Sequence, residues 1–179
     1  KDMIAVAYSY RPEPSGYDDL LRPYINAGME TWVSPGVNDW TRVYPNYNEA
    51  LPNIQEFVRD GQRLGSTGVL NAIWNTDEDN EGLFNNNWYG VLFGAAASWQ
   101  AGTSSITQFQ NNYGQIFHGD ITGKINQAQM ELIAVQRAFS NAGFINGALT
   151  DLFWIDPWSR QGQLDSAKLL PGAHEIRLH

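Results

Sequence analysis

The chain contains no cysteine, and this absence excludes several kinds of chemistry. Disulfide bonds, zinc sites built on thiolates and a cysteine nucleophile all need a residue type that these 179 residues lack. Cysteine-free chains occur in oxidising and in reducing compartments, so the absence does not decide where the protein works.

Positive charge is also scarce. The sequence has 11 Lys and Arg against 19 Asp and Glu, which gives a formal net charge of −8, and its basic residues form no cluster. Nucleic acid is therefore not an expected partner. Long apolar runs are missing as well, because Gly94, Ser98 and Gln100 interrupt the longest one, and we expect no membrane span.

Motifs for metal, acyl-transfer and dinucleotide chemistry are absent too. The sequence has no HExxH, no Gly-x-Ser-x-Gly and no Gly-x-Gly-x-x-Gly. Residues 75–81 resemble the start of a calcium loop, but Asn80 stands where such a loop needs glycine and no glutamate closes it. We expect a solvated acidic loop, and neither a metal nor a cofactor.

Aromatic residues make up 13% of the chain and include seven tryptophans, which indicates a folded protein. The segment 3–10 is apolar on both faces, as is typical of a parallel strand buried on both sides. Strand and helix patterns then alternate, which predicts parallel strands with right-handed crossovers. The predicted strands are 3–10, 30–34 and 68–74, and the predicted helices are 17–27, 49–64 and 88–101.

The last third of the chain contains no convincing strand. Helical patterns occupy 105–117, 122–142, 150–156 and 165–178. We therefore predict two parts, an α/β part over 1–103 and a helical extension over 104–179.

Three parallel strands are too few to close a barrel. The chain also begins almost inside a buried strand, which makes it look truncated. We expect an α/β fold that is the C-terminal part of a (β/α)₈ TIM barrel, strands six to eight, followed by a mainly helical tail. The alternative is a small three-layer α/β domain complete in itself.

In parallel α/β folds, functional groups gather after the C-terminal ends of the strands. Aromatic and acidic residues occupy those positions here, and this combination suits a sugar, which has an apolar C–H face and a rim of hydroxyl groups. The candidate sugar-binding residues are Tyr8, Asp39, Trp40, Trp74, Asp77 and Glu81. Trp32, Trp88 and Trp99 lie inside predicted elements, and we expect them to pack against neighbours.

Three segments carry a family resemblance: 28–40 (GMETWVSPGVNDW), 53–68 (NIQEFVRDGQRLGSTG) and 70–74 (LNAIW), the last continuing to 80–84 (NEGLF). With them the chain resembles the end of the barrel of family 20 glycoside hydrolases, the β-N-acetylhexosaminidase type. It is most similar to a bacterial branch with a long helical extension. The resemblance covers essentially the whole chain.

The resemblance implies a retaining, substrate-assisted hydrolysis of terminal N-acetylhexosamine. In this reaction the acetamido oxygen of the substrate attacks the anomeric carbon while a protein glutamate protonates the leaving group. The family carries an adjacent Asp-Glu pair after the fourth strand, so the acid and its partner are expected upstream, and this chain is assigned no catalytic residue.

The resemblance also implies roles for residues of this chain. Trp74 corresponds to the platform on which the sugar stacks, and Glu81 to the carboxylate that binds its hydroxyl groups, with Asp77 or Glu78 as alternatives. Asp39 and Trp40 lie in the region that contacts the acetamido group. The implied partners are a glycan containing N-acetylhexosamine and the missing N-terminal part of the barrel, in the same polypeptide or as a separate chain. The implied location is secreted or periplasmic.

Two other functions fit the same residues. One is a non-catalytic carbohydrate-binding or scaffold α/β domain. The other is a glycosidase of another barrel family.

Overall fold

Three short strands form a parallel sheet in the order β1-β2-β3. They are β1 (Ile4–Tyr8), β2 (Glu30–Ser34) and β3 (Gly68–Val69), with Ile4 opposite Glu30 and Trp32 opposite Gly68. The computed structural model describes residues 3–40, 42–74, 84–100, 104–144 and 154–178. Within these residues the predicted parallel sheet is confirmed, and no closed barrel is formed.

The third strand is shorter than the predicted 68–74, yet the chain after it stays beside β2. The backbone N–H of Leu70 donates to the Val33 carbonyl (2.9 Å), and that of Ala72 donates to the Pro35 carbonyl (2.8 Å). Gly36 and Ala72 form an isolated parallel bridge. These bonds carry the loops after β2 and β3 side by side toward the same edge of the sheet.

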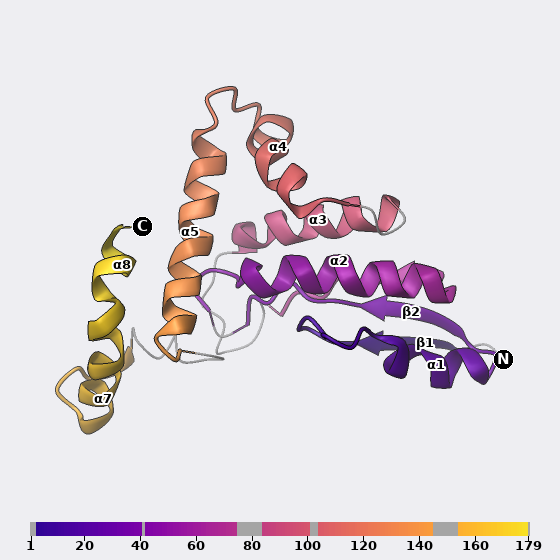
Figure 1. Ribbon diagram of the computed structural model, residues 1–179, viewed down its shortest axis with the longest axis horizontal. Coiled ribbons are helices and arrows are strands. Elements are labelled where there is room, and N and C mark those ends of the chain that lie inside the picture. The colour runs from indigo at the N-terminus through magenta and orange to yellow at the C-terminus, as the bar shows by residue number, and fades with distance from the viewer. Residues whose placement is uncertain (1–2, 41, 75–83, 101–103, 145–153, 179) are drawn as a thin grey trace.

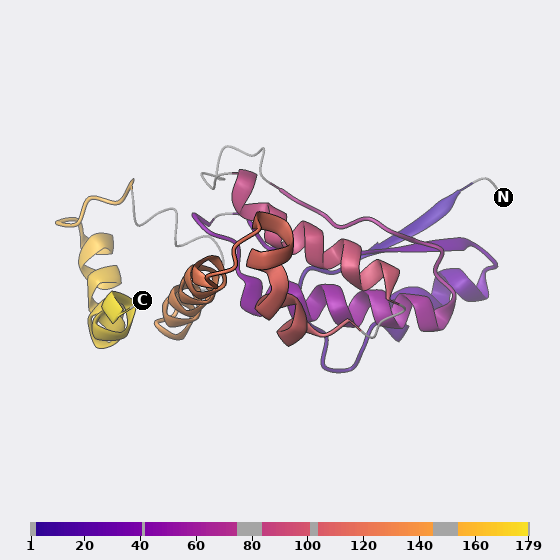
Figure 2. The ribbon, with the colours of Figure 1, turned by 90° about the horizontal axis from the view of Figure 1, so that it is seen from above.

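Two helices follow the first two strands, as predicted. Helix α1 (Asp18–Asn26) begins with two acidic residues, which favour a helix N-terminus, and Gly28 follows its end with a positive φ of 70°. Helix α2 (Tyr47–Leu64) ends at Gly65, whose φ of 88° suits glycine. Figure 2 shows α1 and α2 on one side of the strands.

The core lies between the sheet and these helices. Tyr17 and Phe57 stack with their ring centroids 4.1 Å apart, and both are fully buried. Gly61 lets α2 approach β2, because a Cβ at this position would lie only 2.5 Å from Cγ1 of Val33. Helix α3 (Trp88–Trp99) packs along α2 and adds Tyr89 and Phe93 to the same core.

The other face of the sheet is open in the described residues. Along β1, Ala5 and Ala7 are buried, whereas Ile4 and Val6 are each 43% exposed. The prediction that this strand is buried on both sides is therefore wrong for the structure as described. The helices cover one face only, and the apolar residues of the second face meet no covering layer there.

The helical extension was predicted in outline. Helices α4 (Ile106–His118) and α5 (Lys124–Asn141) match the predicted stretches closely and pack against α2 (Figure 1). The predicted helix 165–178 is divided instead into α7 (Arg160–Leu169) and α8 (Ala173–Leu178), joined by η2 (Leu170–Gly172). Pro171 explains the break, because proline has no backbone N–H to continue a helix. The predicted stretch 150–156 lies mostly outside the described residues.

Candidate functional site

Four aromatic rings, one at the end of β1 and three from the segments after the strands, meet at the C-terminal edge of the sheet. The Tyr10 ring is central: its centroid lies 5.7 Å from that of Tyr8, 5.0 Å from that of Trp40 and 6.3 Å from that of Trp74. We call these four residues the aromatic cluster. It unites the residues predicted after β1, β2 and β3, because parallel strands present their C-terminal ends at one edge.

A glycine makes room for this cluster. A Cβ on Gly36 would lie 2.7 Å from Cδ1 of Tyr10 and 3.3 Å from Cζ3 of Trp40. The first distance is shorter than two carbon atoms tolerate, so any larger residue at position 36 would push the two rings away. The close approach of Tyr10 and Trp40 therefore depends on the missing side chain of Gly36.

The cluster offers an accessible apolar surface. Tyr8 is 67% exposed and Trp74 45% exposed, while Tyr10 and Trp40 are half-buried. Flat rings held at fixed angles can bind the C–H face of a ring-shaped ligand by dispersion and by excluding water. The arrangement of these rings suits binding rather than proton transfer.

Asp39 is buried and holds two loops together. Its Oδ1 accepts a hydrogen bond from the backbone N–H of Trp74 (3.1 Å), and its Oδ2 accepts one from Nδ2 of Asn87 (3.0 Å). Only 2% of the residue is exposed. Asp39 thus fixes Trp74 and the start of α3 relative to the loop after β2. Its predicted direct contact with a sugar stays a prediction.

The loop after β2 has an unusual backbone. Asn38 has a φ of 61°, in the left-handed region, where asparagine is better tolerated than most residues. Its carbonyl accepts from the N–H of Asn46 (3.0 Å), and its Nδ2 donates to Oε2 of Glu49 (3.2 Å). This turn leaves Asp39 buried and Trp40 in the cluster.

Arg42 holds the backbone of Trp40. Its Nη1 donates to the Trp40 carbonyl (3.0 Å), and the residue is only 2% exposed. Burial lowers the pKa of the Arg42 guanidinium, and the nearby carboxylates of Glu49 and Asp39 oppose that shift. The positive charge at this site is therefore enclosed by the protein and is not presented to solvent.

Asn53, on helix α2, links the loops after β1 and β2. Its Oδ1 accepts from the N–H of Gly36 (3.1 Å), and its Nδ2 lies 3.0 Å from the carbonyls of Ser9 and Arg11. The residue is completely buried. Asn53 therefore ties the backbone on both sides of Tyr10 to the glycine that makes room for its ring.

Sequence reasoning placed Tyr8, Asp39, Trp40 and Trp74 at this edge, and the structure brings them together. Asp77 and Glu81 lie outside the described residues. The central position of Tyr10 and the supporting roles of Gly36, Asn53 and Asn87 were not predicted. For Asn53 the one available signal was its polar side chain within the apolar pattern of 49–64. A buried amide needs hydrogen-bond partners, so such a position indicates a supporting role.

Among the residues that the structure describes, no group of three or more histidine, aspartate and glutamate side chains could hold a metal ion. The same ranges contain no helix with the length and apolar character that crossing a bilayer requires. Comparison of the chain with protein-family models, curated proteins and solved structures gives no match.

Proposed function

We propose that this chain is the sugar-binding C-terminal part of a barrel glycosidase that releases terminal N-acetylhexosamine. The aromatic cluster carries the proposal: rings from three strand ends form one accessible surface, and Asp39 and Asn53 hold their loops in place. Such a preformed surface is typical of pockets that bind a pyranose. The sequence resemblance to family 20 glycoside hydrolases supplies the identity of the sugar.

In this proposal Tyr8, Trp40 and Trp74 contact the sugar, and Asp39 acts as a positioning residue. Asp77 and Glu81, which follow Trp74 in the chain, supply carboxylates for the hydroxyl groups. The acidic glutamate and its aspartate partner come from the rest of the barrel. The reaction is the substrate-assisted one, in which the acetamido oxygen attacks the anomeric carbon.

The open face of the sheet supports an incomplete barrel. Ile4, Val6 and Leu70 lie on strands or at strand ends and are 43 to 48% exposed. In a closed barrel, apolar side chains at such positions fill the interior. The proposed partner is therefore the remaining set of βα units, in the same polypeptide or as a separate chain. It would pair with β1 and cover this face.

Sugar binding can be measured on the 179-residue chain by titrating N-acetylglucosamine and following heat or amide chemical shifts. We expect Trp74→Ala to weaken binding by about tenfold, because it removes a stacking ring. The matched control is Trp99→Ala: Trp99 ends α3 and is no member of the aromatic cluster. The prediction that Trp99 packs against neighbours is wrong, because the residue is 91% exposed. Equal binding by the Trp74→Ala variant and the wild type would contradict the proposed site.

The separate claim that the catalytic acid lies outside this chain needs an activity assay. We expect the 179 residues alone to release no product from an aryl N-acetylglucosaminide. Release of product would show that the acid is within the chain. If a longer protein cleaves aryl glucosides as well as the acetamido substrate, a glycosidase of another barrel family is the better assignment.

One observation favours binding without hydrolysis as a second candidate. Asp39 is 2% exposed and each of its carboxylate oxygens accepts a hydrogen bond from the protein, so this carboxylate is suited to positioning the loops rather than to acting as an exposed acid. Glycan binding by the complete natural protein, without hydrolysis, would support a carbohydrate-binding or scaffold domain.

A further inference from the structure

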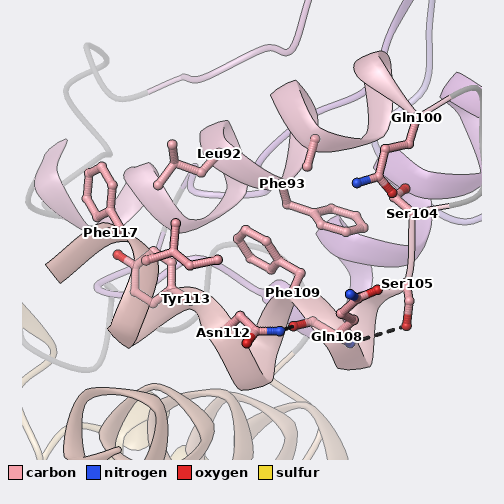
Figure 3. A pocket seen from close by; sticks show the side chains of 12 residues that line it. Leu92, Phe93, Gln100, Ser104, Ser105, Gln108, Phe109, Asn112, Tyr113 and Phe117 are labelled. Carbon is pink, nitrogen blue, oxygen red and sulfur yellow. Dashed lines mark hydrogen bonds between the residues drawn. The ribbon is translucent and has the colours of Figure 1, made fainter. Parts of the chain in front are cut away.

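A groove of about 300 Å³ lies between α3 and α4 and shares no residue with the aromatic cluster (Figure 3). Each helix contributes residues spaced four apart, which places them on one helix face. Leu92 and Ala96 come from α3, and Phe109, Tyr113 and Phe117 come from α4. In Figure 3 the rings of Phe93 and Phe109 point toward each other across the middle of the groove.

The groove is polar at one end. Gln100, Ser104, Ser105 and Gln108 gather there (Figure 3). The Ser105 hydroxyl accepts from the backbone N–H of Gln108 (3.2 Å) and caps α4. The Ser104 hydroxyl differs: the residue is only 3% exposed, and its Oγ has no hydrogen-bond partner within the described structure.

A buried hydroxyl without a partner costs free energy, because it has lost its water. Its backbone is held in place, since the Ser104 carbonyl accepts from Nε2 of Gln55. A ligand group that exchanges a hydrogen bond with this hydroxyl would recover the loss. The groove therefore combines an apolar body with one unsatisfied polar position.

The charge of the ligand follows from the lining. None of the twelve described residues that line the groove is acidic or basic, and the whole chain carries a net charge of −8. A carboxylate or phosphate would meet no counter-charge in the lining and would lose hydration on entry. A neutral ligand avoids this cost.

We propose that the groove between α3 and α4 binds a small neutral amphiphile, with an aliphatic or aryl body along Leu92, Phe93 and Phe109 and a hydroxyl or amide group at Ser104. Its volume is at the lower limit for small-molecule pockets, so the ligand has a chain of moderate length or one or two rings. This site is independent of sugar binding.

The test uses the full 179-residue chain with the neutral fluorophore N-phenyl-1-naphthylamine, whose emission rises in apolar surroundings. We expect binding that 1-octanol reverses and octanoate, at equal concentration, does not. Ala96→Phe fills the groove and should weaken probe binding at least about tenfold. Ala95→Phe is the matched control, since Ala95 is exposed on the same helix and does not line the groove.

Two results would overturn the proposal outright: no probe binding by the wild type, or equal binding by the two phenylalanine variants. Competition by octanoate as strong as that by octanol would overturn the assignment of a neutral ligand. Should circular dichroism show that Ala96→Phe is unfolded, Ile116→Ala decides instead. Ile116 lines the groove but is 81% exposed, so its truncation leaves the fold intact and should still weaken binding several-fold. Unchanged binding by this variant counts against the site.

The polar end is tested by Ser104→Ala. This variant should weaken competition by 1-octanol several-fold and leave competition by octane unchanged. An equal effect on the two competitors would contradict a hydrogen bond at Ser104.

Discussion

The two faces of the small parallel sheet both carry apolar side chains, but their surroundings differ. On the covered face, Ala7 and Val33 are buried beneath α1 and α2. On the open face, Ile4, Val6 and Tyr8 are equally apolar in character but 43 to 67% exposed. An apolar strand therefore indicates that both faces are suited to burial, but not which layer covers each of them.

The difference separates the residues that stabilise the fold from those that stay accessible on the surface. The covered face belongs to a dense core with stacked rings and close helix contacts, so it accounts for the folding of the described α/β part. The open face adds little to that core, and exposed apolar surfaces of this kind are typical of interaction sites. Substitutions on the two faces should therefore differ in what they cost the folded state.

The covered face should be the most sensitive to truncation. Phe57→Ala should lower the free energy of unfolding by about 3–5 kcal/mol, because it removes a fully buried ring that stacks on Tyr17 and leaves a cavity. Urea denaturation followed by circular dichroism measures the change. A loss below about 1 kcal/mol would mean that the core is looser than the structure shows.

Asn53 should be the next most sensitive position. Asn53→Ala leaves the N–H of Gly36 and the carbonyls of Ser9 and Arg11 without this partner. We expect a loss of about 2–3 kcal/mol, together with a change in near-ultraviolet circular dichroism as Tyr10 and Trp40 shift. Unchanged aromatic signals would show that the cluster keeps its geometry without Asn53.

The open face should tolerate truncation in the isolated chain. Val6→Ala should change the free energy of unfolding by less than about 0.5 kcal/mol, because Val6 is already 43% exposed. The same urea denaturation compares it directly with Phe57→Ala. A loss above about 1.5 kcal/mol would show that this face is covered in solution, and dependence on protein concentration would identify a second copy as the cover.

The ion pairs between the covering helices should matter least. Hydrogen bonds from Arg63 and then Arg22 lower the pKa of Asp18. The bond from Arg63 links α1 to α2 at the surface, whereas the bond from Arg22 lies within α1. Because the pKa of Asp18 is lower in the folded state, its charged form stabilises the protein at pH values above the unfolded-state pKa. This stabilisation is lost as the pH falls through the folded-state pKa.

Asp18→Asn should therefore lower Tm by about 1–2 °C at neutral pH, with the difference from wild type shrinking below about pH 4. Asp19→Asn is the matched control, because Asp19 is the adjacent, exposed acidic residue of the same first turn. An Asp18 effect that persists at pH 2.5 or in high salt would contradict an electrostatic cause.

Periodicity predicted most of the architecture. Strand 30–34 and the helices near 18–26, 47–64 and 106–118 were recognisable from the sequence. The glycines that end the helices and the spacing of apolar residues are local properties of the chain. Burial of β1 on both sides was predicted wrongly, since a covering layer is not a local property. The break at Pro171 was missed because the apolar pattern continues through it.

The position of the site could be predicted from the sequence, but the hydrogen bonds that support it could not. The rule that strand ends converge placed Tyr8, Trp40 and Trp74 together. It could not show that Asp39 is buried, since its burial depends on the contact with Asn87, the residue before α3. Sequence alone marks the residues that follow strands, whereas the supporting bonds depend on three-dimensional contacts from α2 and α3.

The hydrogen bonds of Asp39 and Asn53 also limit how this protein can be re-engineered. The loops of βα units are often regarded as exchangeable parts, each carried by its own strand and helix. Here Asn53 joins the first loop to the second, and Asp39 joins the second to the third. A graft that replaces one of these loops would break bonds in its neighbour, so the three loops have to be transplanted, or diversified, as one set.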